Sequence, residues 1–315
     1  MLKYIAVRFA LIPFLLVGVA TVVFFLFQFT PGDPISARLG LRMSDFSPEQ
    51  IKTMREELGL NDPIYVQYFR YMGNLLKGDM GTSITTRRPV FEEITTRIPA
   101  TMELALSSIL LVTLLSIPLG IMAATWRGSI LDNATMSLAL VGFSMPSFWL
   151  GIMFILLFSI QFHMFPTSGR GEGMIFHRID HLVMPAVTLS LGLIGYNSRI
   201  VRSAVLDVKN MDYVTTARSK GISERRVLFQ HILPNVLIPI VTVLGLQFAS
   251  LLGGAVIIET IFAWPGIGRL AVNAVFRRDY PIILGTTLVF SAIYIVINLV
   301  IDILYSIIDP RIRLE

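Results

Sequence analysis

"TTARSKGISERR", residues Thr215–Arg226, is a strongly basic stretch between two long apolar segments of a chain that is 54% hydrophobic. The polar region around it, from Arg199 to Gln230, holds seven basic residues, three acidic ones and a single glycine, Gly221. Charged loops between apolar segments are typical of membrane proteins, where they lie at the aqueous surface. The stretch therefore predicts a membrane protein with a basic surface loop.

The residues of this loop predict two short helices joined at a glycine. Asp212 is a candidate N-cap, because its carboxylate can accept backbone N–H bonds, and the first helix would then run from about Tyr213 to Lys220. Gly221 would end that helix, because glycine takes the left-handed conformation at little cost. Ser223 is the candidate N-cap of the second helix.

Small residues stand beside two basic ones on the first of these helices. They are Thr215, Thr216, Ala217, Arg218, Ser219 and Lys220. Small side chains let another backbone approach closely, and the arginine guanidinium offers a fork of donors to carboxylates or carbonyls. A short exposed helix with such side chains suits a groove on a partner protein. A basic loop held against anionic lipid fits the same pattern equally well.

The composition of the whole chain also indicates a membrane protein. Mean hydropathy is +0.70, and charged residues make up 15% of the chain, against roughly 25% in an ordinary soluble domain. The net charge of +5 needs no nucleic acid to explain it, because basic residues collect in cytoplasmic loops. The chain has no cysteine, which excludes disulfides, thiolate metal sites and cysteine nucleophiles.

Six apolar segments are long enough to cross a membrane as helices, which takes about 20 residues. They lie within Phe9–Phe29, Leu104–Trp126, Asn133–Phe162, Leu182–Ser198, Ile232–Ile258 and Tyr280–Ile301. None alternates apolar and polar residues as barrel strands do. The first is longer than the apolar core of a signal peptide, about 7–15 residues, so we interpret it as a retained anchor.

Charge asymmetry predicts the orientation of these six spans. With both termini in the cytoplasm, the cytoplasmic side holds 12 basic residues, and the two short outer loops hold 5. The segment between the first two spans is too long for this rule to apply. We therefore expect cytoplasmic termini.

The predicted spans divide the chain into four parts. These are an N-terminal helix (1–30), an external segment (31–98), a membrane domain (99–308) with a polar loop (199–231), and a tail (309–315). The external segment contains a helical pattern at Pro48–Leu58, with Ser47 as its N-cap, and an amphipathic one at Asp62–Leu76. The segment fits an ordinary surface lid or a docking surface for a partner.

Helix-disturbing residues mark two of the spans. Met145, Pro146 and Ser147 interrupt the third, and Gly253 and Gly254 interrupt the fifth. Such residues loosen helices that line a path, although they also serve close packing. Glu259 precedes a predicted turn at Ala263–Arg269 and is a carboxylate near membrane depth or a solvated charge at a helix end. The candidates for a translocation path are Met145, Pro146, Ser147, Gly253, Gly254 and Glu259.

The sequence lacks the motifs of an enzyme. The dipeptide Gly-Lys of a P-loop is absent, as are the zinc-protease and nucleophile-elbow motifs. His163, His177 and His181 do not predict a metal site, because interfacial histidines are common. Proton-coupled carriers need ionisable groups within their spans, and Asp302 is the one candidate. Energy for any transport would come from a partner or an ion gradient.

The basic loop resembles the cytoplasmic "EAA" motif of bacterial ABC-importer permeases: a glutamate, two alanines, three variable residues, a glycine and a later Leu-Pro. The matching positions are Thr215, Thr216, Ala217, Gly221, Leu233 and Pro234, of which the two threonines depart from Glu and Ala. "DYVTTARSKG" is similar to the dipeptide, oligopeptide and nickel permease branch. So are "TPGDP", "GLNDPIYVQY", "GDMGTSITTRRPV", "PATMELAL", "SMPSFWLG", "IIETIFAWPGIGR", "RDYPI" and "DPRIR", which together span the chain.

The resemblance implies an all-α, six-span fold of the type I (MetI-like) permease class in a bacterial inner membrane. It implies that Thr215–Gly221 is a coupling helix seated in a groove of an ATPase, with Arg218 and Lys220 beside the motif. The implied partners are a second homologous permease, two ATPases that carry ATP and Mg, an external solute-binding protein and membrane lipid, with no nucleic acid and no cofactor on this chain. The implied cargo is peptide, with glutathione or nickel as alternatives within the family. A stand-alone carrier or channel is the alternative from another class.

Overall fold

The computed structural model describes residues 2–29, 47–57, 61–171, 173 and 175–308. These residues form helices, turns and one isolated bridge between Thr82 and Pro89, and no β-strand occurs among them. The predicted all-α class is therefore confirmed. The tail at 309–315 and the segment at 30–46 lie outside the described residues.

Four helices of the described chain are long and apolar enough to cross a membrane without a break. They are α1 (Leu2–Gln28), α6 (Ile98–Thr125), α9 (Ile175–Lys209) and α14 (Tyr280–Ile308). Two bent pairs bring the number to six if each pair is one span. One is Ile130–Ser144 with Ser147–Gln161, and the other is Glu224–Leu237 with Pro239–Gly253. The six predicted segments thus all correspond to helices, and α9 continues eleven residues beyond Ser198, the predicted end of its span.

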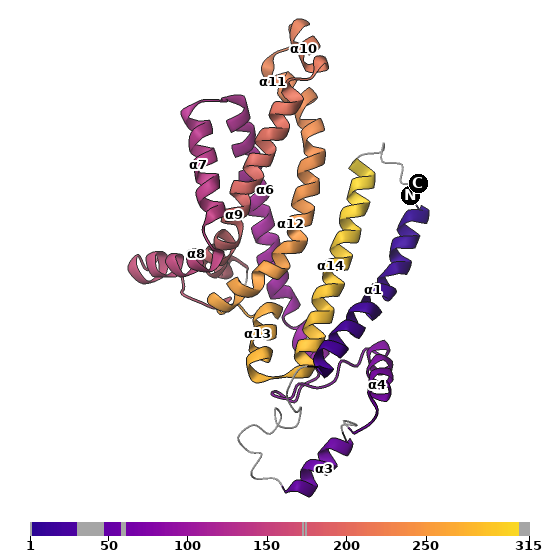
Figure 1. The fold of residues 1–315 in the computed structure, drawn as a ribbon. Coiled ribbons are helices and arrows are strands. Elements are labelled where there is room, and N and C mark those ends of the chain that lie inside the picture. Colours follow the sequence, from indigo (N-terminus) through magenta and orange to yellow (C-terminus); the bar gives the residue numbers. More distant parts are fainter. Residues whose placement is uncertain (1, 30–46, 58–60, 172, 174, 309–315) are drawn as a thin grey trace. The chain divides into compact units, whose positions relative to one another are not determined.

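The third predicted span is broken at the predicted place. α7 (Ile130–Ser144) has Met145 as its C-cap, and α8 (Ser147–Phe154) begins after Pro146 and continues as the π-helix η2 (Ile155–Gln161). Met145 is extended, with φ −85° and ψ 128°, as steric clash with a following proline favours. The two halves meet at 99°, so the interruption is a sharp turn (Figure 1).

The fifth span is bent at a different place from the predicted one. Gly253 and Gly254 lie inside the continuous helix α12 (Leu233–Ile261), so the prediction that they interrupt it was wrong. The 43° bend falls between Leu237 and Pro239. Proline removes a backbone donor and clashes with the carbonyl four residues earlier, whereas glycine keeps its hydrogen bonds.

The described chain divides into two compact units. The first comprises Ala100–Trp264 with the end of α14, and its helices α7, α8 and α12 pack against α9. A Cβ atom at Gly120 of α6 would lie 2.5 Å from the Cβ of Val201 in α9 and 2.7 Å from the carbonyl oxygen of Ser198. A glycine is therefore required where these two helices approach each other.

The second unit comprises Leu2–Pro99 and Pro265–Ile295. Its core joins α5 (Val90–Thr95) to α13 (Ile267–Arg277) and the start of α14. The two predicted external helices are present as α3 (Pro48–Glu57) and α4 (Ile64–Leu76). Ser47 and Gln50 cap α3 reciprocally: the Ser47 amide donates to Gln50 Oε1 at 2.8 Å, and the Gln50 amide donates to Ser47 Oγ at 3.2 Å.

A buried carboxylate fixes the loop before α5. Asp279 accepts hydrogen bonds from the Ser83 hydroxyl at 2.5 Å and from the amides of Ile84 and Thr85 at 3.1 and 3.0 Å. Arg278, just before it, ends α13 in the left-handed conformation. Asp279 thereby ties part of the external segment to the corner between α13 and α14 within the second unit.

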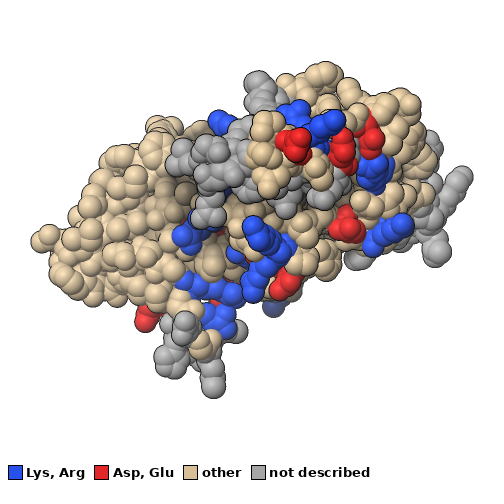
Figure 2. Space-filling model, turned by 90° about the horizontal axis from the view of Figure 1, so that it is seen from below, with Lys and Arg blue, Asp and Glu red and all other residues tan. Residues whose placement is uncertain are grey.

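Charged side chains are unevenly distributed over the surface. Viewed from below, lysines, arginines and acidic residues occur together on part of the face, and a broad neighbouring area carries none of them (Figure 2). Surfaces without charge are the ones that lipid tails cover at low cost.

Candidate functional site

The basic loop forms a helical hairpin at the end of α9 and α12 (Figure 1). Its two arms are α10 (Asp212–Ser219) and α11 (Glu224–Val227), and the π-helix η3 (Leu228–Ile232) leads from α11 into α12. The predicted first helix is thus present, shifted by one residue. Asp212 is its first residue and not its cap. The N-cap is Met211, which makes no side-chain capping hydrogen bond.

Gly221 ends α10 as predicted. It has φ +75°, and its amide donates to the Arg218 carbonyl at 2.9 Å. The amide of Ile222 donates to the Ala217 carbonyl at 3.3 Å. This pair of bonds is a Schellman motif, which satisfies carbonyls at the helix end and reverses the chain. Ser223 occupies the predicted N-cap position of α11, without a side-chain capping bond.

An ion pair closes the hairpin. Arg218 Nε donates to Glu224 Oε1 at 2.7 Å, and its Nη2 donates to Oε2 at 3.3 Å. The third guanidinium nitrogen points at the Lys209 carbonyl, at 3.4 Å. Arg218 therefore binds its own loop in the described chain, and its predicted contact with a partner stays a prediction. Sequence reasoning missed this pair, although Arg218 and Glu224 flank the turn at Gly221.

The inner face of the hairpin is apolar. Val214 and Ala217, three residues apart on α10, are buried, and so is Val227 of α11. The Ala217 side chain therefore lies inside the hairpin, and its predicted part in coupling stays a prediction. Two buried positions one helical turn apart anchor α10 and leave its other side to solvent.

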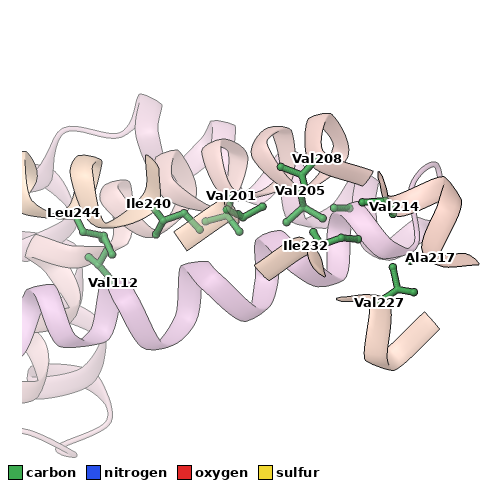
Figure 3. Close-up of a cluster of buried hydrophobic side chains, with 12 residues drawn as sticks. Val112, Val201, Val205, Val208, Val214, Ala217, Val227, Ile232, Ile240 and Leu244 are labelled. Atoms are coloured by element: carbon green, nitrogen blue, oxygen red, sulfur yellow. The ribbon is translucent and has the colours of Figure 1, made fainter. Parts of the chain in front are cut away.

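The same apolar cluster continues into the membrane helices. Figure 3 shows it running from Ala217 and Val227 at the hairpin to Val112 and Leu244 at the far end. The intervening side chains are Val201, Val205, Val208, Val214, Ile232 and Ile240, contributed by α9, α10, η3 and α12. Close-packed interiors have low compressibility. The cluster therefore joins the hairpin to α6, α9 and α12 by continuous packing.

The outer face presents most of the predicted coupling residues. Thr215, Thr216, Lys220, Gly221 and Pro234 are exposed, Arg218 and Leu233 are half-buried, and Ala217 is buried. Arg225 and Arg226 are exposed too, as are two large side chains that the motif does not contain, Tyr213 of α10 at 41% and Phe229 of η3 at 59%. Small, basic and aromatic groups on one exposed hairpin suit a protein partner, because interface cores are enriched in aromatic residues and arginine.

A second ion pair stabilises the neighbouring turn between α6 and α7. Asp132 accepts from Arg202 Nε at 2.6 Å and Nη2 at 2.8 Å, and from the Gly128 amide at 2.9 Å. The carboxylate is buried, so α7 is tied to the C-terminal part of the same helix, α9, that leads into the hairpin. The two residues are 70 positions apart, and no local sequence pattern could have paired them.

The candidates for a translocation path occupy different environments. Glu259 has no exposed surface, and its carboxylate accepts a hydrogen bond from the Thr101 hydroxyl at 2.6 Å. It is thus a buried carboxylate between α12 and α6, not a solvated charge. Pro146 and Gly253 are exposed, and Met145 and Ser147 are half-buried. The burial of Gly254 and of the Asp302 side chain lies outside the described residues.

No group of three or more metal-ligating side chains occurs among the described residues. The ring nitrogen Nδ1 of His181 lies 3.1 Å from the Ser168 carbonyl oxygen, and the side chain of His177 lies outside the description. The described chain therefore offers no assembled site for a metal ion.

Several apolar helices long enough to span a bilayer, with a packed polar hairpin at their end, indicate a multi-pass membrane protein. The model of the binding-protein-dependent transport system inner membrane component matches residues 116–314, and the N-terminal model of the same membrane component matches residues 1–105. The chain belongs to this family of binding-protein-dependent transport system inner membrane components.

Curated relatives align with the chain over nearly its full length. The di/tripeptide transport system permease DppB of Pseudomonas aeruginosa is 41% identical and covers 99% of both chains. The oligopeptide permease AppB of Bacillus subtilis is 41% identical over 95% of both, and the glutathione permease GsiC of Salmonella paratyphi A is 42% identical over 99% of both. The resemblance to the peptide permease branch is thereby confirmed.

A solved structure supports the fold. A chain of the MetNI methionine ABC transporter, in an inward-facing conformation, superposes with a TM-score of 0.56 and covers 69% of this chain and 96% of its own length. Sequence identity is 17%, so the likeness concerns the fold alone. The predicted fold of an ABC-importer permease is confirmed.

Proposed function

We propose that this permease carries di- and oligopeptides across a bacterial inner membrane, driven by two partner ATPases. The supporting observation is the α10–α11 hairpin, whose outer face is exposed and whose inner face is continuous with the core of the spans. The other proposed partners are a second homologous permease, which completes the pore, and an external solute-binding protein. ATP and Mg are bound by the ATPases, and both termini of this chain lie in the cytoplasm.

The proposed mechanism is alternating access. ATP favours closure of the two ATPases, and each closure displaces the hairpin seated in its groove. A ligand shifts a conformational equilibrium only through its different affinities for the two states, and here ATP provides that difference. Because Val214 and Ala217 are buried with side chains of α9 and η3, the displacement reaches the spans and changes which side of the path is open.

Peptide is the cargo that the relatives favour, since the di/tripeptide and oligopeptide permeases align over at least 95% of the chain. Glutathione, itself a tripeptide, is a second candidate because its permease is 42% identical. Nickel stays an alternative within the family.

Reconstitution with the partner subunits in vesicles tests this proposal. We expect ATP-dependent uptake of a labelled dipeptide or oligopeptide when the binding protein is present, and no uptake without ATP. Competition with glutathione and with nickel ions distinguishes the cargo alternatives. Transport by this chain alone, without ATP, would instead support the stand-alone carrier.

A further inference from the structure

The external helix α4 has three distinct sides. Tyr68 and Tyr71 face α1: the Tyr68 ring lies 5.5 Å from that of Phe24, and the Tyr71 ring stacks on Phe24 at 5.6 Å. The Tyr68 hydroxyl also lies 2.8 Å from Thr21 Oγ1. These contacts hold α4 against α1 within the second unit.

An adjacent side of α4 is apolar and faces no other described element. Tyr65, Phe69 and Leu76 are 65, 68 and 84% exposed, and the half-buried Met72 falls between them. Spacings of four, three and four residues place all four side chains on one stripe of a helix with 3.6 residues per turn. This stripe lies roughly 100° around the helix from the tyrosines that contact α1.

The side opposite this stripe is polar. It carries Gln67, Arg70, Asn74 and Lys77, and Arg70 is paired with Asp62 at 2.5 Å. An apolar aromatic stripe opposed by polar and basic groups is the pattern of a helix that lies in the plane of a membrane interface.

The position of α4 along α1 indicates that the membrane covers the apolar stripe of α4. The most apolar stretch of α1 is Phe9–Leu26, and α4 contacts the last part of it, at Thr21 and Phe24. The end of a spanning segment lies at the level of the lipid headgroups, where aromatic residues are enriched. Leu26 and Phe29, at this same end of α1, are themselves exposed.

We propose that α4 is an interfacial helix, whose stripe of Tyr65, Phe69, Met72 and Leu76 inserts into the outer headgroup boundary of the bilayer. The long external segment is thereby held at the membrane surface beside the outer end of α1. This inference depends on α1 spanning the membrane and not on the proposed cargo or the ATPases.

The absence of cysteine in the chain makes a direct test simple. Single cysteines at positions 65, 69 and 76, and at 70 and 74 on the polar side, are spin-labelled in the full chain in phosphatidylethanolamine–phosphatidylglycerol vesicles. Collision rates are measured with oxygen, which concentrates in lipid, and with chromium oxalate, which stays in water. Leu15, exposed within the span, serves as the lipid control, and Lys52 of α3 serves as the water control.

We expect the oxygen-to-chromium ratio at 65, 69 and 76 to exceed that at 70 and 74 several-fold and to approach the ratio at Leu15. Equal ratios on both sides, near that of Lys52, would overturn the proposal. Labels at 65 and 69 that neither reagent reaches would also overturn it, because a protein partner would then cover the stripe.

Discussion

Arg218 and Glu224 form a bidentate ion pair across the turn at Gly221, with Nε and Oε1 2.7 Å apart. The pair joins the last turn of α10 to the first residue of α11, so it fixes the angle between the two arms. The Glu224 side chain is 69% exposed, and the contribution of such a pair to stability is at most about 1 kcal/mol. Its importance lies in the shape of the hairpin.

Charge reversal tests this role. We expect Arg218→Glu to reduce ATP-dependent uptake several-fold, because two carboxylates then repel each other across the turn. Adding Glu224→Arg restores the pair with reversed polarity and should recover most of the uptake. If Arg218 instead bound an ATPase carboxylate directly, the double variant would transport no better than Arg218→Glu. Lys220→Glu, in the same turn, serves as the comparison.

Substitutions at Gly221 test the chain reversal between α10 and α11. A valine at this position would have to adopt the left-handed φ of +75°, which costs about 1–2 kcal/mol for an L-residue. It would meet no steric clash, because no atom lies within 4 Å of the added Cβ. We expect Gly221→Val to lose the ATPase during co-purification while the permease still inserts into the membrane. Gly221→Asn should retain more of the ATPase, because asparagine tolerates this conformation. Gly253→Val is the control, since Gly253 is helical and equally free of close neighbours.

The length and apolarity of the segments were enough to predict the six helical regions, because a spanning helix needs only a long apolar run. Local chemistry also predicted the Gly221 reversal, the Ser47 cap of α3 and the break at Pro146. Each of these depends on residues within a few positions of one another, so the sequence carries the information directly.

Features that depend on distant residues could not be predicted in the same way. The pairs Asp132–Arg202 and Ser83–Asp279 join positions 70 and 196 residues apart. The inward direction of Ala217 depends on where α9 and η3 lie, and a motif shows only that the residue is small. Both Pro239 and the glycine pair Gly253–Gly254 could have bent this span. The helix bends at Pro239 because proline lacks the backbone donor that glycine keeps.

The Asp279 anchor can be tested by proteolysis. Asp279→Asn keeps one acceptor oxygen but loses the charge that strengthens its bonds to the Ser83 hydroxyl and the two amides. We expect the loop to open more often, so that trypsin cleaves after Arg87 several-fold faster in membrane vesicles; the bond after Arg88 precedes Pro89 and resists trypsin. Asp79→Asn is the matched control, because Asp79 is exposed and accepts a bond from the Gly81 amide nearby. Equal cleavage rates in the two variants would show that Asp279 does not hold the loop.

The apolar connection between hairpin and spans predicts an uncoupled transporter. Val214→Ala removes buried volume between α10 and the helices beneath it while leaving the outer face of α10 unchanged. A valine truncation of this kind costs on the order of 1–3 kcal/mol. We expect the ATPase to bind and hydrolyse ATP normally, but fewer peptides to be transported for each ATP hydrolysed. Thr216→Ala, on the exposed face, should instead alter ATPase affinity and leave the ratio of transport to hydrolysis unchanged. A Val214→Ala variant with an unchanged ratio would show that motion reaches the spans by another route, such as the continuous backbone of η3 and α12.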